Sequence, residues 1–482
     1  MNYKMIGRFL AQILAIEALF MLPALGISLG YREYGTAIAF CQTMAITFCL
    51  AGLLYLLCRK APRLFRAKEG FVCVGISWVA LSLTGCLPFV LSGEIPHYVD
   101  ALFEIVSGFT TTGASILQNV EAMSHGNLYW RSFSHWVGGM GVLVFLLAIS
   151  SGSNAGFTMH LLQAESPGPN VDKLVPRMRK TASILYLIYI VLTLINFLFL
   201  LAGRMPVFDA VCTAFGTAGT GGFGIKADSM AGYSPYLQNV TTIFMILFGV
   251  NFSCYYLLLL KQVKSVFKDE ELRLYLGLIL TAVLLIIVDI RPLYASLEEA
   301  VRHAAFQVGS IITTTGFATT DVDLWPTFSK TILLLLMLVG ACAGSTGGGL
   351  KVARLMLLMK SLRRNIRQIL NPRKVAVVRN NGQAVSQTVL DNTNAYLAAY
   401  AVILFLSFLA ISVDGMSVTT NISAVFACFN NIGPGLDAVG PVRCYGDFSI
   451  FSKLVLIFDM LAGRLEIFPI LVLFSRNTWR NH

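Results

Sequence analysis

The sequence predicts an all-α polytopic membrane protein with about ten transmembrane helices. Three observations predict this fold: a composition unsuited to water, apolar runs long enough to span a membrane, and a short pattern that occurs four times. Of the 482 residues, 56% are hydrophobic and only 13% are charged, whereas soluble domains have about 25% charged residues. This composition excludes a water-soluble enzyme and makes the bilayer the solvent of the chain.

Apolar runs between clusters of charge give ten predicted spans. An even number of spans places both ends of the chain on the same side of the membrane. The predicted spans cover residues 9–29, 37–57, 71–92, 131–151, 182–203, 236–260, 274–290, 328–359, 394–413 and 449–474.

The basic residues indicate which side faces the cytoplasm. Six loop or terminal segments on one face hold 26 of the 36 Lys and Arg residues. By the positive-inside rule this face is cytoplasmic, so both termini are expected in the cytoplasm. The formal charge of +11 is thereby attributed to membrane topology and lipid contact, and no nucleic-acid partner is expected. The six segments are 1–8, 58–70, 172–180, 261–273, 351–381 and 475–482.

Four further segments are apolar enough to enter the membrane but too short to cross it, so they are predicted to be re-entrant. Each begins near a residue that can cap a helix and ends in a stretch rich in Thr, Gly or Asn. Their ends share one pattern, an apolar residue, three mostly small or polar residues and a glycine. The segments are 100–118, 209–226, 297–320 and 421–440, and the pattern covers Phe109–Gly113, Phe215–Gly219, Ile312–Gly316 and Phe429–Gly433.

The four patterns predict two N-terminal spans followed by four repeats of span, pore helix and span around a central pore. The repeated glycines are spaced by 106, 97 and 117 residues, which is the mark of an internal repeat. The expected units are 1–70, the N-terminal pair of spans; 71–180, repeat 1; 181–272, repeat 2; 273–390, repeat 3 with a broken span and a basic cytoplasmic loop; and 391–482, repeat 4.

Such a repeat predicts a cation filter, because non-helical backbone at membrane depth is tolerated only where it is buried or lines a wet cavity. Carbonyl groups from four short stretches can replace the water around a dehydrated cation. The pore helices point their negative C-terminal ends at the same place, which disfavours anions. The predicted filter residues are Thr110, Thr111, Thr112, Gly113, Gly216, Thr217, Ala218, Gly219, Thr313, Thr314, Thr315, Gly316, Asn430, Asn431, Ile432 and Gly433.

A glycine-rich run, Gly344-Ser345-Thr346-Gly347-Gly348-Gly349, lies in the middle of the predicted span 328–359. Each interior glycine costs a helix about 1 kcal/mol relative to alanine, so this run is expected to interrupt the helix. The alternative is close helix packing through small residues. Arg464 is the one base placed deep in a span, where it must face protein or water. A structural ion pair with Asp459 is the alternative for Arg464.

The four filters together with the segment Gly340–Lys351 resemble the Trk/Ktr/HKT superfamily of potassium transporters, and within it the bacterial TrkH-type uptake subunit. The resemblance implies K+ as the transported ion and the bacterial inner membrane as the location. It also implies a homodimer and regulation by a cytoplasmic TrkA-like ring that binds the nucleotide. It further makes Gly344–Gly349 an intramembrane gate and places Arg464 in the pore beneath the filter.

The second and fourth filters depart from the Thr-rich pattern, so a less selective K+/Na+ pathway on the same fold stays open. A cation-coupled symporter also stays open, because coupling depends on whether two gates can open together. The basic loops near Arg63 and Arg363 are candidate docking surfaces for the ring.

Other chemistry is rejected on context. Gly219–Gly224 matches GxGxxG but follows a membrane half-helix, and Gly344–Lys351 lacks the order of residues of a P-loop. The dispersed Cys and His residues give no metal spacing, so no cofactor is expected on this chain. A polytopic membrane enzyme is the distant alternative, because the acids within spans are isolated from one another.

Overall fold

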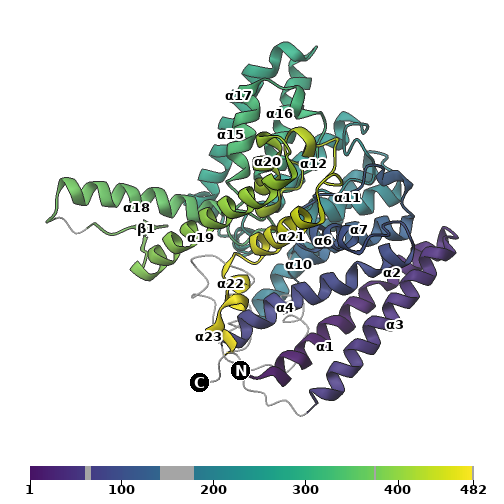
Figure 1. The fold of residues 1–482 in the computed structure, drawn as a ribbon. Coiled ribbons are helices and arrows are strands. Elements are labelled where there is room, and N and C mark those ends of the chain that lie inside the picture. The colour runs from purple at the N-terminus through teal and green to yellow at the C-terminus, as the bar shows by residue number, and fades with distance from the viewer. Residues whose placement is uncertain (60–66, 140, 142–177, 374–375, 480–482) are drawn as a thin grey trace.

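The computed structural model describes residues 1–59, 67–139, 141, 178–373 and 376–479 and confirms the predicted all-α polytopic membrane fold (Figure 1). Among these residues, six helices are long and apolar enough to cross a membrane, and a bent pair adds a seventh span. The predicted span 131–151 and the basic segments 58–70, 172–180, 351–381 and 475–482 lie partly outside the described residues.

The N-terminal helices form one side of the bundle. Helix α1 (Tyr3–Phe20) continues into α2 (Leu22–Gly30) and packs against α3 (Tyr34–Leu57) and α4 (Ala67–Gly85), which α5 (Leu87–Leu91) extends. The last helix, α23 (Arg476–Trp479), lies beside the start of α1, and the rings of Tyr3 and Trp479 stack at 6.4 Å. The two ends of the chain therefore lie together (Figure 1).

Four short helices occupy the predicted re-entrant segments. Three of them begin two or three residues before the predicted caps, and the fourth begins after Ser296, whose hydroxyl accepts a hydrogen bond from the amide of Glu299 at 3.1 Å. They are α6 (Tyr98–Phe109), α11 (Val207–Gly219), α16 (Leu297–Ile312) and α20 (Val418–Phe429).

The spans before these short helices are regular, whereas three of the helices after them are broken. The break between α12 (Pro235–Phe248) and α13 (Phe252–Leu259) bends the chain by 88° and corrects the predicted continuous span 236–260. There the side chain of Asn251 accepts from the amide of Ser253 at 2.9 Å and starts a new helix. The other helices are α7 (His125–Gly139), α10 (Met178–Ala202), α15 (Glu270–Ile290), α17 (Thr327–Met337), α18 (Val352–Leu370), α19 (Gln387–Ile411), α21 (Ile450–Arg464) and α22 (Phe468–Phe474).

Helix α18 projects away from the bundle, and strands β1 (Arg379–Asn380) and β2 (Gln383–Ala384) form a small hairpin beside it (Figure 1). Inside the bundle, the largest apolar cluster joins the N-terminal helices to the first and fourth short helices, and two smaller clusters surround the second and third. The remaining short elements are α14 (Val263–Phe267), η1 (Val120–Ala122), η4 (Arg291–Leu293), η5 (Val322–Leu324), η6 (Ser412–Asp414) and η7 (Asp437–Val439).

Candidate ion pathway

The four short helices end in the same backbone conformation. In each case a residue with positive φ is followed two positions later by a glycine with positive φ, so the chain turns sharply at the helix end. We call these four-residue stretches the filter segments. Their positive-φ residues are Thr111 (56°) and Gly113 (82°), Thr220 (52°) and Gly222 (72°), Thr314 (58°) and Gly316 (87°), and Asn431 (55°) and Gly433 (100°).

The second filter segment is Gly219–Gly222, which corrects the predicted alignment by three residues. The predicted residues Gly216, Thr217 and Ala218 form the last turn of α11, and Gly219 ends it. The hydrogen bonds agree with this shift: the amide of Gly221 donates to the carbonyl of Gly216 at 2.9 Å, as the amide of Thr112 donates to that of Ser107 at 2.8 Å. A sequence signal for this alignment is the Gly-Phe pair 222–223, which matches Gly-Phe at 316–317.

The four filter segments close into a ring. The Cβ position of each terminal glycine is occupied by the carbonyl of the residue that precedes the glycine of the next segment. The fourth segment meets the first, so the contacts run once around a central axis. The facing pairs are Gly113 and the Gly221 carbonyl, Gly222 and the Thr315 carbonyl, Gly316 and the Ile432 carbonyl, and Gly433 and the Thr112 carbonyl.

Side chains of the filter segments are buried and hydrogen-bonded to neighbouring protein groups. The hydroxyls of Thr110 and Thr112 bond to each other at 2.8 Å, and those of Thr313 and Thr315 at 2.7 Å. In the fourth segment, the Asn431 amide nitrogen donates to the Thr112 hydroxyl at 3.0 Å. These contacts hold the backbone of the filter segments on the side away from the central axis, which we call the space behind the segments.

A cavity of about 330 Å³ lies over the ring and is lined by all four terminal glycines of the filter segments. Arg131 and Asp447 also line it, so both signs of charge border this space. The cavity therefore opens onto the ring at all four terminal glycines.

A buried ion pair joins the chain after the first and second filter segments. Arg131 and Glu104 are 2% and 0% exposed and lie 2.5 Å apart. Glu104 also accepts from the Ile116 amide at 2.9 Å, and Arg131 donates to the Gly224 carbonyl at 2.8 Å. Sequence reasoning missed this pair, because Glu104 and Arg131 lie on two different helices, 27 residues apart in the sequence.

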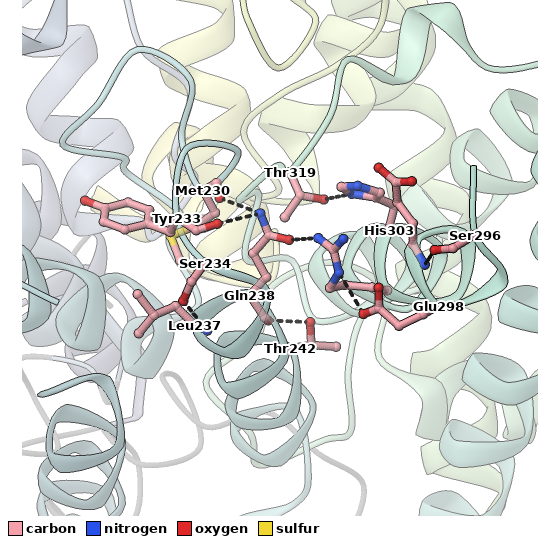
Figure 2. A network of polar contacts seen from close by, with 12 residues as sticks. Met230, Tyr233, Ser234, Leu237, Gln238, Thr242, Ser296, Glu298, His303 and Thr319 are labelled. Atoms are coloured by element: carbon pink, nitrogen blue, oxygen red, sulfur yellow. Dashed lines mark hydrogen bonds and ion pairs between the residues drawn. The ribbon is translucent and has the colours of Figure 1, made fainter. Parts of the chain in front are cut away.

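A second network, shown in Figure 2, joins the chain after the second and third filter segments. The side-chain amide of Gln238 donates to the Met230 carbonyl at 3.0 Å, and its oxygen accepts from Arg302. His303 is hydrogen-bonded to the Thr319 hydroxyl at 2.8 Å. Neighbouring repeats are therefore fixed to each other on the same side of the ring as the cavity.

The glycine-rich run interrupts the span as predicted, because residues 338–351 between α17 and α18 form no helix. The Gly348 amide donates to the Thr314 hydroxyl at 2.7 Å, which places this segment directly against the third filter segment. A Cβ on Gly348 would lie 2.8 Å from the Asn430 carbonyl. The ends are held by Glu271, whose carboxylate accepts from the amides of Ala343 at 2.5 Å and Ala353 at 3.2 Å.

Arg464 joins this run to the first repeat. Its guanidinium donates to the carbonyls of Thr346 at 2.8 Å, Gly138 at 2.5 Å and Gly139 at 2.8 Å. Asp459, the alternative partner, accepts from the Ser407 hydroxyl at 2.6 Å. The charge of Arg464 is thus met by backbone carbonyls at the centre of the molecule.

Comparison with known proteins agrees with this architecture. Relatives include the Trk system potassium uptake protein TrkH of Salmonella typhimurium, 36% identical, and that of Escherichia coli K12, 35% identical, each matched over 100% of both chains. The crystal structure of the potassium transporter TrkH from Vibrio parahaemolyticus superposes with a TM-score of 0.90 at 31% identity and covers 100% of both chains. Residues 36–480 match the TrkH family, described as cation transport proteins. The chain therefore belongs to the TrkH family of cation transport proteins.

Proposed function

We propose that this chain is the pore-forming subunit of a potassium uptake system. The observation that carries the proposal is the closed ring of four filter segments, in which each terminal glycine faces a carbonyl of the next segment. Full-length relatives named potassium uptake proteins support K+ as the transported ion.

Within this proposal the filter segments coordinate the dehydrated ion through backbone carbonyls. Because the side chains are bonded among themselves, the backbone is the ion-facing part, and threonine is not needed in every segment. The pore helices direct about half a negative charge each towards the ring and favour cations. The coordinating residues are Thr110–Gly113, Gly219–Gly222, Thr313–Gly316 and Asn430–Gly433.

The gate in this proposal is Gly344–Gly349, which would block the pathway until it moves from the third and fourth filter segments. Arg464 would keep it closed by its bond to Thr346 and would raise the barrier to cations by its positive charge. The segment on either side of the run is tied to Glu271, so opening would break the bonds of its middle to Thr314 and Arg464.

The proposed assembly is a homodimer in the bacterial inner membrane, surrounded by lipid and regulated by a cytoplasmic TrkA-like nucleotide-binding ring. Helix α18 projects from the bundle (Figure 1), and apolar side chains and Arg363 are exposed along it, which supports contact with other chains. The contact between Tyr3 and Trp479 supports both termini on one side of the membrane, and the positive-inside rule makes that side cytoplasmic. The division into units 1–70, 71–180, 181–272, 273–390 and 391–482 stays a prediction.

The test is uptake of radioactive rubidium by potassium-transport-deficient cells, with potassium, sodium and caesium as competitors. Wild-type uptake blocked better by potassium than by sodium supports a potassium pathway, whereas equal competition supports the less selective alternative. Gly113→Ser should reduce the preference, since its side chain would meet the Gly221 carbonyl. Gly277→Ser is the matched control, because no atom lies within 4 Å of its Cβ position. Absence of uptake, even with a TrkA-like partner, would refute the proposal.

A further inference from the structure

The space behind the filter segments is not filled in the same way in every repeat. In the first and third segments a pair of threonine hydroxyls fills it, Thr110 with Thr112 and Thr313 with Thr315. The equivalent residues of the second segment are Gly219 and Gly221, which have no side chains. Glycine gives the chain more conformational freedom than any other residue, so another part of the protein must hold this segment in place.

The imidazole of His135 occupies the position of the missing side chains. His135 lies on α7 and is fully buried. A Cβ on Gly221 would overlap three ring atoms of His135, Nδ1, Cγ and Cε1, with Cε1 at 2.5 Å. The side of His135 that faces Gly219 is instead backbone, since a Cβ there would lie 2.6 Å from the His135 carbonyl carbon.

Two contacts fix the ring of His135 itself. Its Nδ1 lies 2.9 Å from the Gly108 carbonyl, which can only accept, so Nδ1 carries the proton and donates. The ring also packs against Phe223 with centroids 4.2 Å apart. Because Gly108 belongs to α6, the ring of His135 connects the second filter segment to the first of the four short helices.

We infer that His135 is a positioning residue for ion selection: its ring holds Gly221 so that the carbonyl of this residue keeps its place in the ring. The inference rests on the proposed function, because a role in ion selection requires that ions pass through the ring. His135 acts on selectivity through Gly221 and does not touch the ion. It also explains why the second filter segment has glycine where the first and third have threonine.

A double-variant cycle tests this role. His135→Ala should loosen the second segment, and Gly221→Ser should displace it, so each should lower the ratio of potassium to sodium competition by about threefold to tenfold. The variant with both changes should recover to within about twofold of wild type, because every ring atom that blocks the serine is gone. Rubidium uptake is measured per amount of protein in the membrane.

Three controls make the result specific. Gly219→Ser should lower the same ratio and should not be rescued by His135→Ala, because backbone rather than the ring lies against it. His135→Asn keeps a donor for Gly108 and should lie between wild type and His135→Ala, which also provides a milder variant if alanine prevents folding. His125→Ala, on the same helix, should leave the ratio unchanged.

The outcomes separate the two proposals. No rescue in the double variant, or an unchanged ratio in His135→Ala, with normal wild-type uptake would overturn the role of His135 alone. Absence of rubidium uptake by wild type would overturn the proposed function and this role with it.

Discussion

Replacing Arg464 by alanine tests whether the guanidinium keeps the glycine-rich run closed. Within the described residues its guanidinium donates to three carbonyls: those of Gly138 and Gly139 hold the side chain, and that of Thr346 lies on the run. Of these three bonds, the one to Thr346 distinguishes a closed run from a displaced one. A hydrogen bond to a charged group contributes about 1.5–3 kcal/mol, so losing it should shift the closed-to-open ratio by about 10-fold to 150-fold.

The assay is rubidium flux into liposomes that contain the purified protein without a regulatory partner. Arg464→Ala should raise the flux by at least about tenfold. Arg464→Lys keeps the charge but cannot reach several carbonyls in a fixed fork, so its flux should be intermediate. Arg291→Ala is the control, since Arg291 also donates to a backbone carbonyl, that of Tyr294, outside the pathway. A folded Arg464→Ala protein with wild-type or lower flux would refute the reasoning.

Three further predictions concern buried and loop carboxylates. Arg131→Met should cost about 3–5 kcal/mol by leaving Glu104 charged and unpaired, and adding Glu104→Gln should recover most of the loss in thermal unfolding in detergent. Glu271→Leu should raise rubidium leak into liposomes because the ends of the glycine-rich run lose their acceptor, whereas Glu271→Gln, which keeps one, should stay near wild type. Two hydroxyl donors lower the pKa of Asp437 below its usual value, so its stabilising effect is present above about pH 4 and is lost as pH falls through the lowered pKa; the fall in unfolding temperature on acidification should be smaller in Asp437→Asn.

Much of the fold follows from the sequence because few backbone structures are stable inside a bilayer. Apolar length, basic loops and re-entrant segments are each visible along the chain, and they predict the short helices α6, α11, α16 and α20. The interruption at Gly344–Gly349 is also visible, since glycine weakens a helix wherever it occurs.

The register of the second filter segment could not be obtained in the same way. Phe215–Gly219 fits the repeated sequence pattern, and the end of α11 together with the positive φ of Thr220 and Gly222 favours Gly219–Gly222 instead. Just after that end, the ring of His135, a residue of another helix, fills the space beside Gly221. The break before α22 also interrupts the predicted span 449–474: Ile467 adopts a φ of 66°, which isoleucine disfavours, while its amide donates to the Ala462 carbonyl at 2.8 Å.

The ring of filter segments has a direction. A side chain added at Gly113 would press on the carbonyl of Gly221, one added at Gly222 on that of Thr315, and one added at Gly433 on that of Thr112. A substitution in one segment should therefore displace the next segment around the ring more than the previous one. In a tetramer of identical subunits, every mutation would change all four positions at once. Here each of the four positions is encoded separately, so each quarter of the ring can change by itself during evolution. The condition is that the next segment can accommodate the new side chain.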